Sequence, residues 1–140
     1  MNNYLVVIPA RYQSSRFPGK PLADIHGKSM IQRVWEKCVE ATGPDSVLVA
    51  TDDDRILEHC QDYDMQVELT SSDCLTGTDR LYEVAKKRKS DIYINVQGDE
   101  PLISPEDIKA VIDASKNEPT ITFNAMCSIK NEDDFRNPNV

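Results

Sequence analysis

Short apolar runs with strand character alternate along this chain with segments of helical periodicity. The runs are rich in β-branched and aromatic residues, and they are Tyr4–Ile8, Ser46–Ala50, Gln66–Leu69, Ile92–Val96 and Thr120–Ile129. Runs such as Val47–Ala50 and Ile92–Val96 show little polar alternation, which is typical of strands buried on both faces of a parallel sheet. The pattern predicts an α/β fold with a Rossmann-like, mostly parallel sheet and helices on both faces.

The segments between the runs predict four helices. The first carries apolar residues one turn apart from Met30 to Val39 and ends at Gly43 and Pro44. A Ser cap, a Pro at the first position and two acids predict the start of the last helix at Ser104. The helices between them are predicted over Arg55–Asp62 and Asp79–Lys89.

Length, charge and cysteine usage narrow the class of protein. A chain of 140 residues with one core predicts a single domain over residues 1–140. The net charge of −8 argues against a nucleic-acid partner, which would need a positive surface. No apolar run approaches the roughly 20 residues that span a bilayer, so no membrane contact is expected. Scattered cysteines without a CxxC pair favour free thiols in the cytoplasm; they are Cys38, Cys60, Cys74 and Cys127.

Ligands of open parallel sheets bind beyond the carboxyl ends of the strands, so the segments that follow the strands are the candidate sites. After the first strand, Arg11, Arg16 and Lys20 lie in a loop with small serines and Gly19. The loop matches neither GxxxxGK[ST] nor GxGxxG, but its backbone N–H groups and cations suit an anion. The alternative is a solvated loop that Pro18 and Pro21 stiffen.

The other strand ends carry acids and hydroxyls. Thr51–Arg55 is most typical of a helix cap, with contact to a ligand as the alternative. Thr70–Arg80 would either cap its own helix or bind a base or sugar. Asp99 follows the fourth strand on a Gly-assisted turn, where it would bind a hard cation such as Mg²⁺ or only its own backbone. Together the four strand ends favour a nucleoside triphosphate site.

The same residues resemble a known family. The pieces "VVIPARYQSSRFPGKPLADIHGKSMIQRV", "VATDDDRI", "TGTDRLYEVA", "DIYINVQGDEPLI" and "NPNV" occur in family order. They are similar to those of the 3-deoxy-manno-octulosonate cytidylyltransferases, also called CMP-Kdo synthetases, which have a nucleotide-diphospho-sugar transferase fold. The acylneuraminate cytidylyltransferases, with a looser ARxGSKxxPxKN-type loop, rank second.

The resemblance implies transfer of CMP from CTP to Kdo, an eight-carbon 2-keto sugar acid, with release of pyrophosphate for lipopolysaccharide biosynthesis. It implies catalytic roles for Arg11, Lys20 and Asp99, with Mg²⁺ bound at Asp99. The nucleotide-binding residues that it implies are Ala10, Arg11, Ser14, Arg16, Lys20, Thr76, Gly77, Thr78, Arg80 and Gln97.

Two departures from the family leave alternatives open. Cys74 stands where the family usually has His before the (S/T)GT(D/E)R element. The 140 residues correspond to the N-terminal half of the family's usual extent, and the other half normally supplies a second metal-binding Asp, much of the sugar-acid pocket and the homodimer interface. The alternatives are a non-catalytic CTP-binding fragment and a cytidylyltransferase for a related sugar acid such as an acylneuraminate.

Overall fold

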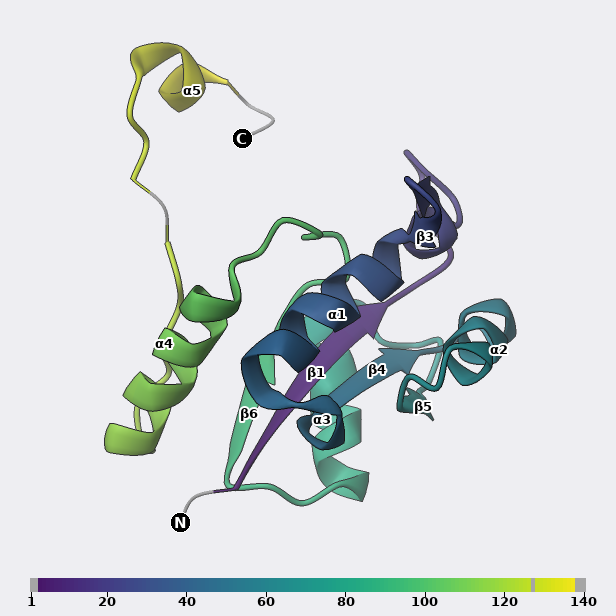
Figure 1. Cartoon of the computed structure of the whole chain (residues 1–140), viewed down its shortest axis with the longest axis horizontal. Coiled ribbons are helices and arrows are strands. Elements are labelled where there is room, and N and C mark those ends of the chain that lie inside the picture. Colours follow the sequence, from purple (N-terminus) through teal and green to yellow (C-terminus); the bar gives the residue numbers. More distant parts are fainter. Residues whose placement is uncertain (1–2, 127, 138–140) are drawn as a thin grey trace.

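A four-stranded parallel sheet organises the protein (Figure 1). The computed structural model describes residues 3–126 and 128–137, so Cys127 and most of the NPNV piece lie outside the described residues. The strands are β1 (Tyr4–Ala10), β4 (Val47–Thr51), β5 (Val67–Leu69) and β6 (Ile92–Asn95), in the order β5-β4-β1-β6. The strands pair in register at Val6 with Val47 and at Tyr4 with Ile92. The predicted parallel α/β architecture is confirmed.

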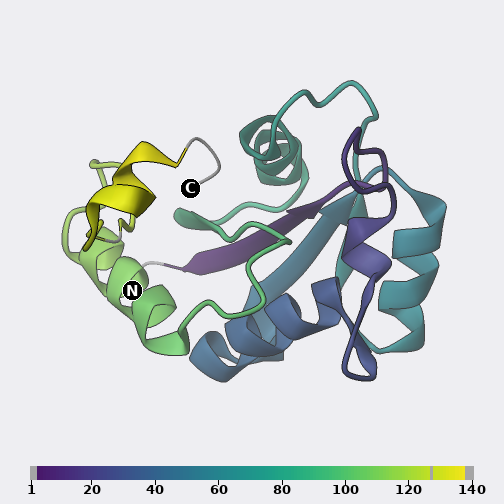
Figure 2. The same ribbon diagram turned by 90° about the horizontal axis from the view of Figure 1, so that it is seen from above.

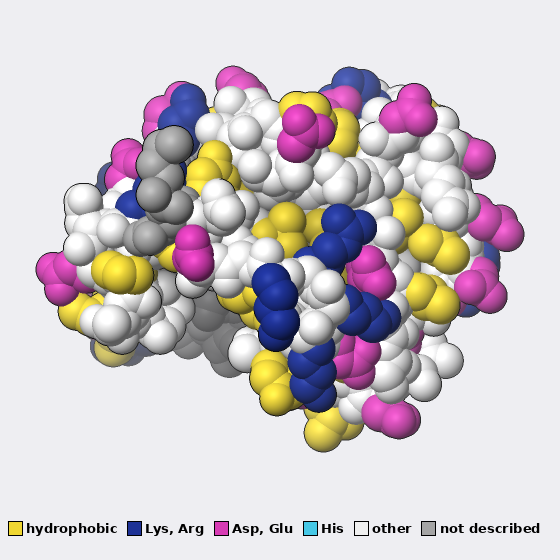
Figure 3. All heavy atoms as spheres, turned by 90° about the horizontal axis from the view of Figure 1, so that it is seen from below, with side chains coloured by type: hydrophobic (Ala, Val, Ile, Leu, Met, Phe, Trp, Pro, Cys, Tyr) yellow, Lys and Arg dark blue, Asp and Glu magenta, His cyan; other side chains and the backbone are white. Residues whose placement is uncertain are grey.

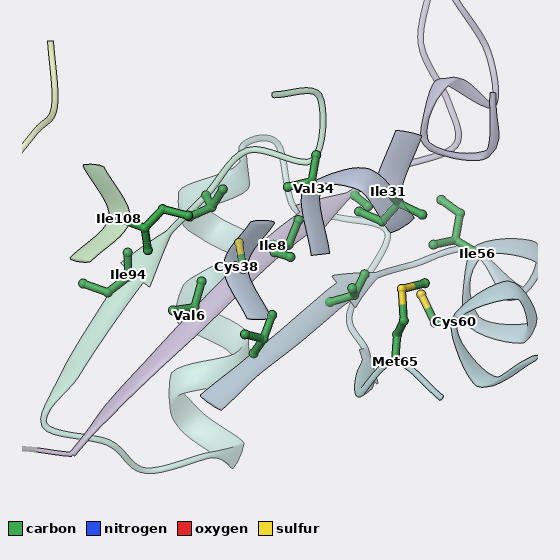
Figure 4. Packing of buried hydrophobic residues seen from close by; sticks show 14 of the residues in the cluster. Val6, Ile8, Ile31, Val34, Cys38, Ile56, Cys60, Met65, Ile94 and Ile108 are labelled. Carbon is green, nitrogen blue, oxygen red and sulfur yellow. The ribbon is translucent and has the colours of Figure 1, made fainter. Parts of the chain in front are cut away.

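Helices cover both faces of this sheet, as predicted (Figure 2). One face packs against α1 (Met30–Thr42), α2 (Asp54–Asp62) and α4 (Pro105–Asn117), and the other packs against α3 (Gly77–Lys87). The larger core joins Val6 and Ile8 of β1 to Ile31, Val34 and Cys38 of α1, all fully buried (Figure 4). The smaller core joins β1 and β4 to Val84 of α3.

Local caps set the helix boundaries. Ser29 caps α1 by accepting a hydrogen bond from the Gln32 N–H, and Gly43, with φ of 86°, ends that helix. The predicted start of α3 at Asp79 was late. Thr76 is the N-cap, and Asp79 lies in the first turn as its partner in a capping box. The helix also ends at Lys87 rather than at Lys89.

The predicted strand over Thr120–Ile129 is wrong for the residues that the structure describes, because residues 120–126 and 128–129 hold no strand. Ile121, Met126 and Ile129 are 52%, 93% and 55% exposed. Residues 121–125 run beside β6 and α4 without entering the sheet, and a short helix, α5 (Glu132–Arg136), follows. Apolar character alone does not make a strand, since its backbone groups need a paired neighbour.

Short elements that the periodicity did not predict link the larger ones. They are the hairpin of β2 (Asp24–Ile25) and β3 (Lys28–Ser29) and the 3₁₀ turns η1 (Lys20–Leu22) and η2 (Pro44–Ser46). His26 and Gly27 both have positive φ in the hairpin turn. In the described part of the chain, none of the helices has the length and apolar character needed to cross a membrane.

Truncation of the central strand tests the core. Ile8→Ala should lower the free energy of unfolding by about 2–5 kcal/mol, because it leaves a cavity between β1 and α1. Leu102→Ala, at a side chain that is 92% exposed, is the control and should change little. Equal denaturant midpoints for the two variants would contradict this description of the core.

Candidate functional site

The candidate site lies beyond the carboxyl ends of β1 and β6. The chain passes from β1 through α1 to β4 on one side, and it later returns through α3 to β6 on the other side of β1. Such a reversal of strand order opens a crevice in which ligands of α/β sheets bind. The segments that follow β1, β5 and β6 meet at this crevice.

A cavity of about 130 Å³ occupies the crevice. Six of the predicted nucleotide-binding residues line it, and they are Ala10, Arg11, Thr76, Gly77, Arg80 and Gln97. Pro9, Cys74 and Leu75 complete the lining. Three segments far apart in sequence therefore converge as predicted, and they combine cations, an amide and the N-terminus of α3.

Two glycines allow these segments to approach closely. A Cβ on Gly98 would lie 2.8 Å from the Pro9 carbonyl oxygen, and a Cβ on Gly77 would lie 3.0 Å from Pro9 Cγ. The Gln97 amide is also within 3.3 Å of that Gly77 position. Side chains at either glycine would push the ends of β1 and β6 and the start of α3 apart.

Lys20 and Asp99 meet at the crevice although they are 79 positions apart in sequence. Lys20 Nζ donates a hydrogen bond to Asp99 Oδ2 at 3.0 Å, with the two side chains 41% and 52% exposed. An ion pair this exposed contributes only about 0–1 kcal/mol to stability, so a ligand can replace it at little cost. Lys20 can then bind an anion, and Asp99 can bind a cation.

The basic loop continues the site outward from the cavity. A wider hollow of about 610 Å³ is lined by Arg11, Tyr12, Gln13, Ser14, Ser15, Pro18 and Arg55. Arg11 lines both this hollow and the cavity, so it joins them. Arg16 is exposed and is not among the lining residues of either one.

Two residues of the hydroxyl-rich segment differ in what they can contact. The Thr76 hydroxyl accepts from the Asp79 N–H at 3.1 Å and lies 2.9 Å from Asp79 Oδ2, so capping occupies it. Thr78 lines a separate hollow of about 530 Å³ beside β6 and α4, which Gln97 also lines. Of the two predicted uses of this segment, the capping one is present in the structure.

Arg80 is buried, with an exposed fraction of 3%. Its Nη1 donates to Thr70 Oγ1 at 2.5 Å and to the Ser71 carbonyl at 3.3 Å, and its Nη2 lies 3.7 Å from Asp52 Oδ1. Buried charges need such partners. Arg80 therefore holds the segment after β5 against the end of β4 while it forms part of the cavity wall.

Cys74, at the family's usual His position, faces the cavity and lies 3.4 Å from Glu83 Oε1. Glu83 also accepts the Ser71 N–H at 2.8 Å, which lowers the pKa of its carboxyl. Burial, followed by the hydrogen bond to Glu83, raises the pKa of the Cys74 thiol. The thiol is therefore a neutral, weakly polar wall group at neutral pH, unlike an imidazole.

Asp99 is suited to share a metal ion with a bound phosphate. The described residues contain no cluster of three or more His, Cys, Asp or Glu side chains that could enclose a metal by themselves. Mg²⁺ commonly takes one or two carboxylates and completes its shell with phosphate oxygens and water. The exposed carboxylate beside Lys20 fits that donor set.

A second group of cations lies at the opposite end of the strands. Figure 3 shows Lys and Arg side chains gathered on the face where α3 ends, and Lys87, Arg88, Lys89 and Lys116 line a hollow there. Glu68 lies 3.4 Å from both Lys87 and Arg88. This group flanks the amino ends of β1 and β6, away from the crevice, so it is the weaker candidate for a phosphate site.

A family model described as a cytidylyltransferase matches residues 5–139. The chain belongs to the cytidylyltransferase family. The 3-deoxy-manno-octulosonate cytidylyltransferase of Syntrophotalea carbinolica is 48% identical over 135 residues, which are 96% of this chain and 54% of that relative. The one from Arabidopsis thaliana, named as mitochondrial, is 50% identical over 130 residues, 91% of this chain and 45% of the relative.

A solved structure agrees with these relatives. The CMP:2-keto-3-deoxy-manno-octonic acid synthetase complexed with CTP matches with a TM-score of 0.81 at 47% identity, over 85% of this chain and 49% of that chain. The predicted resemblance to the 3-deoxy-manno-octulosonate cytidylyltransferases is confirmed, and the chain spans about half the length of the curated relatives that it matches.

Sequence analysis did not list three residues that the structure places at or next to the candidate site. Tyr12 lies inside the quoted loop motif, and Arg55 and Asp52 follow β4, where helix capping was preferred to ligand contact. The signal that could have found them is that both segments follow adjacent parallel strands. Their side chains therefore end at the same edge of the sheet.

Substitution of Gly98 tests the close approach of the strand ends. Gly98→Ala should lower the free energy of unfolding by about 1–3 kcal/mol, because the methyl group would collide with backbone at Pro9. Ser72→Ala, at an exposed position, provides the control for chemical denaturation. A Gly98→Ala variant as stable as the unaltered chain would show that the contact is absent.

Proposed function

We propose that this chain is a CTP-binding domain of a 3-deoxy-manno-octulosonate cytidylyltransferase. The observation that carries the proposal is the meeting of Lys20, from the loop after β1, with Asp99, from the turn after β6. Relatives of that name at 48% and 50% identity, and a solved relative complexed with CTP, support the choice of nucleotide. The reaction is transfer of CMP from CTP to Kdo, with pyrophosphate as the leaving group.

Under this proposal, one group of site residues binds the nucleoside and another binds the triphosphate. The cytosine and ribose lie in the cavity near Gln97 and the start of α3, and the triphosphate extends past Arg11 toward Lys20, Ser14 and Arg16. In-line attack on the α-phosphate builds negative charge on the phosphate oxygens and on the leaving pyrophosphate. The cations of Arg11 and Lys20 would stabilise that charge.

Asp99 is the residue of this chain that would hold Mg²⁺, together with phosphate oxygens of CTP. When bound, the ion neutralises charge on the phosphates. Lys20 would then exchange its contact with Asp99 for a contact with the triphosphate. The exposed Lys20–Asp99 pair thus keeps both groups oriented in the crevice until the ligand arrives.

A second candidate function is CTP binding without turnover. It is favoured by one observation: among the described residues, Asp99 is not part of a larger carboxylate cluster at the crevice. The acceptor could also be a related sugar acid such as an acylneuraminate. A role in lipopolysaccharide biosynthesis in the cytoplasm belongs to the same proposal, and the reduced, buried Cys38 and Cys60 suit such a compartment.

Removal of the loop lysine tests nucleotide binding. Lys20→Ala should weaken CTP binding about tenfold or more, because it removes a charge-assisted contact to phosphate. Lys89→Ala, an exposed lysine beyond the far end of α3, is the matched control and should bind CTP as the unaltered chain does. Isothermal titration measures both. Equal affinities for the two variants would remove Lys20 from the site.

Turnover is tested by pyrophosphate release from CTP, Mg²⁺ and Kdo. Asp99→Asn should abolish the Mg²⁺-dependent signal, whereas Glu100→Gln, the adjacent exposed carboxylate, should retain it. Release that depends on Asp99 supports the full reaction. Clear CTP binding without release supports the binding-only function. Failure to bind CTP, with clear binding of another nucleotide, would refute the choice of CTP.

A further inference from the structure

The basic loop is closed at its base by contacts between Tyr12 and Gly19. The Gly19 N–H donates to the Tyr12 carbonyl at 2.8 Å. The Tyr12 ring packs against Gly19 so closely that a Cβ there would lie 2.9 Å from Tyr12 Cε2. Gly19 also has φ of 72°, which other residues adopt only under strain. The ring of Tyr12 therefore fixes the point where the loop returns toward Lys20.

Arg55, at the start of α2, covers the same tyrosine ring. Its guanidinium carbon lies 3.3 Å from the centre of the Tyr12 ring, within cation–π range. This contact joins the loop after β1 to the helix after β4. In the described part of the chain, it is the shortest of the cation–π contacts.

Asp53 holds the Arg55 side chain in place. Its two carboxylate oxygens accept from Arg55 Nε at 3.0 Å and Nη2 at 2.7 Å, and Oδ1 also accepts from the Arg55 N–H as the cap of α2. The Asp53 N–H in turn donates to Thr51 Oγ1 at 3.2 Å. Because Asp53 already neutralises Arg55, the guanidinium is better suited to hold the ring than to bind a phosphate.

We propose that Asp53, Arg55 and Tyr12 act as a loop clamp, a set of positioning residues that holds the basic loop in the conformation that receives a triphosphate. This inference rests on the proposed CTP-binding function. The clamp pre-organises Arg11 and Ser14, which line the same hollow as Tyr12 and Arg55. Pre-organisation raises affinity because ligand binding then needs to order less of the chain.

The clamp predicts that substitutions affect the affinities for CTP and CMP differently, which a general structural role does not predict. CTP reaches the loop with its β- and γ-phosphates, whereas CMP lacks both and occupies only the inner cavity. Loss of the clamp should therefore weaken CTP binding and leave CMP binding unchanged. The Arg55 side chain is 58% exposed, so its removal opens no cavity in the core.

Titration of CTP and CMP into matched variants tests the clamp. Arg55→Ala and Tyr12→Leu should each bind CTP about tenfold more weakly, the order expected when a ligand must order a loop, with CMP affinity unchanged. Tyr12→Phe keeps the aromatic ring and should therefore bind CTP as tightly as the unaltered chain does. The control is Lys86→Ala, which removes the cation that lies 4.4 Å from the Tyr82 ring on α3.

Limited trypsin digestion gives a second measurement that needs no nucleotide. Cleavage after Arg16 should be faster in Arg55→Ala than in the unaltered chain or in Lys86→Ala. Equal losses for CTP and CMP, or unchanged CTP affinity with unchanged cleavage, would overturn the clamp while leaving the proposed function standing. An unaltered chain that binds no CTP would overturn the proposed function and the clamp's role in it.

Discussion

The parallel pairing of β1 with both β4 and β6 is the constraint on which the rest of this structure depends. It buries Val6, Val7 and Ile8 completely, which fixes β1 between two layers of helices. It also turns the carboxyl end of β1 into the point where strand order reverses. The groups that line the cavity lie at the end of β1 or in the segments that follow β1, β5 and β6, so the pairing brings them to the same edge of the sheet.

The charged side chains at this edge of the sheet differ in burial and in the partners that they bind. Arg80 is buried and its hydrogen bonds are directed to protein groups, so it stabilises the wall of the cavity. The side chains of Lys20 and Asp99 are about half exposed and form a weak ion pair with each other. The groups that must change partners when a ligand binds are thus the exposed ones. The separation of rigid wall and exchangeable charge suits a site that binds and releases a polyanion.

Sequence analysis predicted the parallel sheet, its helices and the loops that form the site, because each rests on local spacing of apolar and capping residues. Its errors also have local causes. The apolar run at residues 120–129 resembles a strand, but strand formation depends on a paired neighbour that periodicity does not report. The start of α3 was misplaced by two positions because Gly77 and Thr78 were assigned to the preceding loop.

The sequence by itself determined which segments are strands and helices, which loops carry cations and carboxylates, and which family the chain resembles. Only the tertiary structure decided which of those groups touch. Lys20 meets Asp99, and Tyr12 meets Arg55, across separations that no local pattern encodes. The physical reason is that strand pairing and helix packing bring distant segments together through burial of the whole core. A side chain's partner is therefore a property of the assembled sheet and not of its neighbours in the sequence.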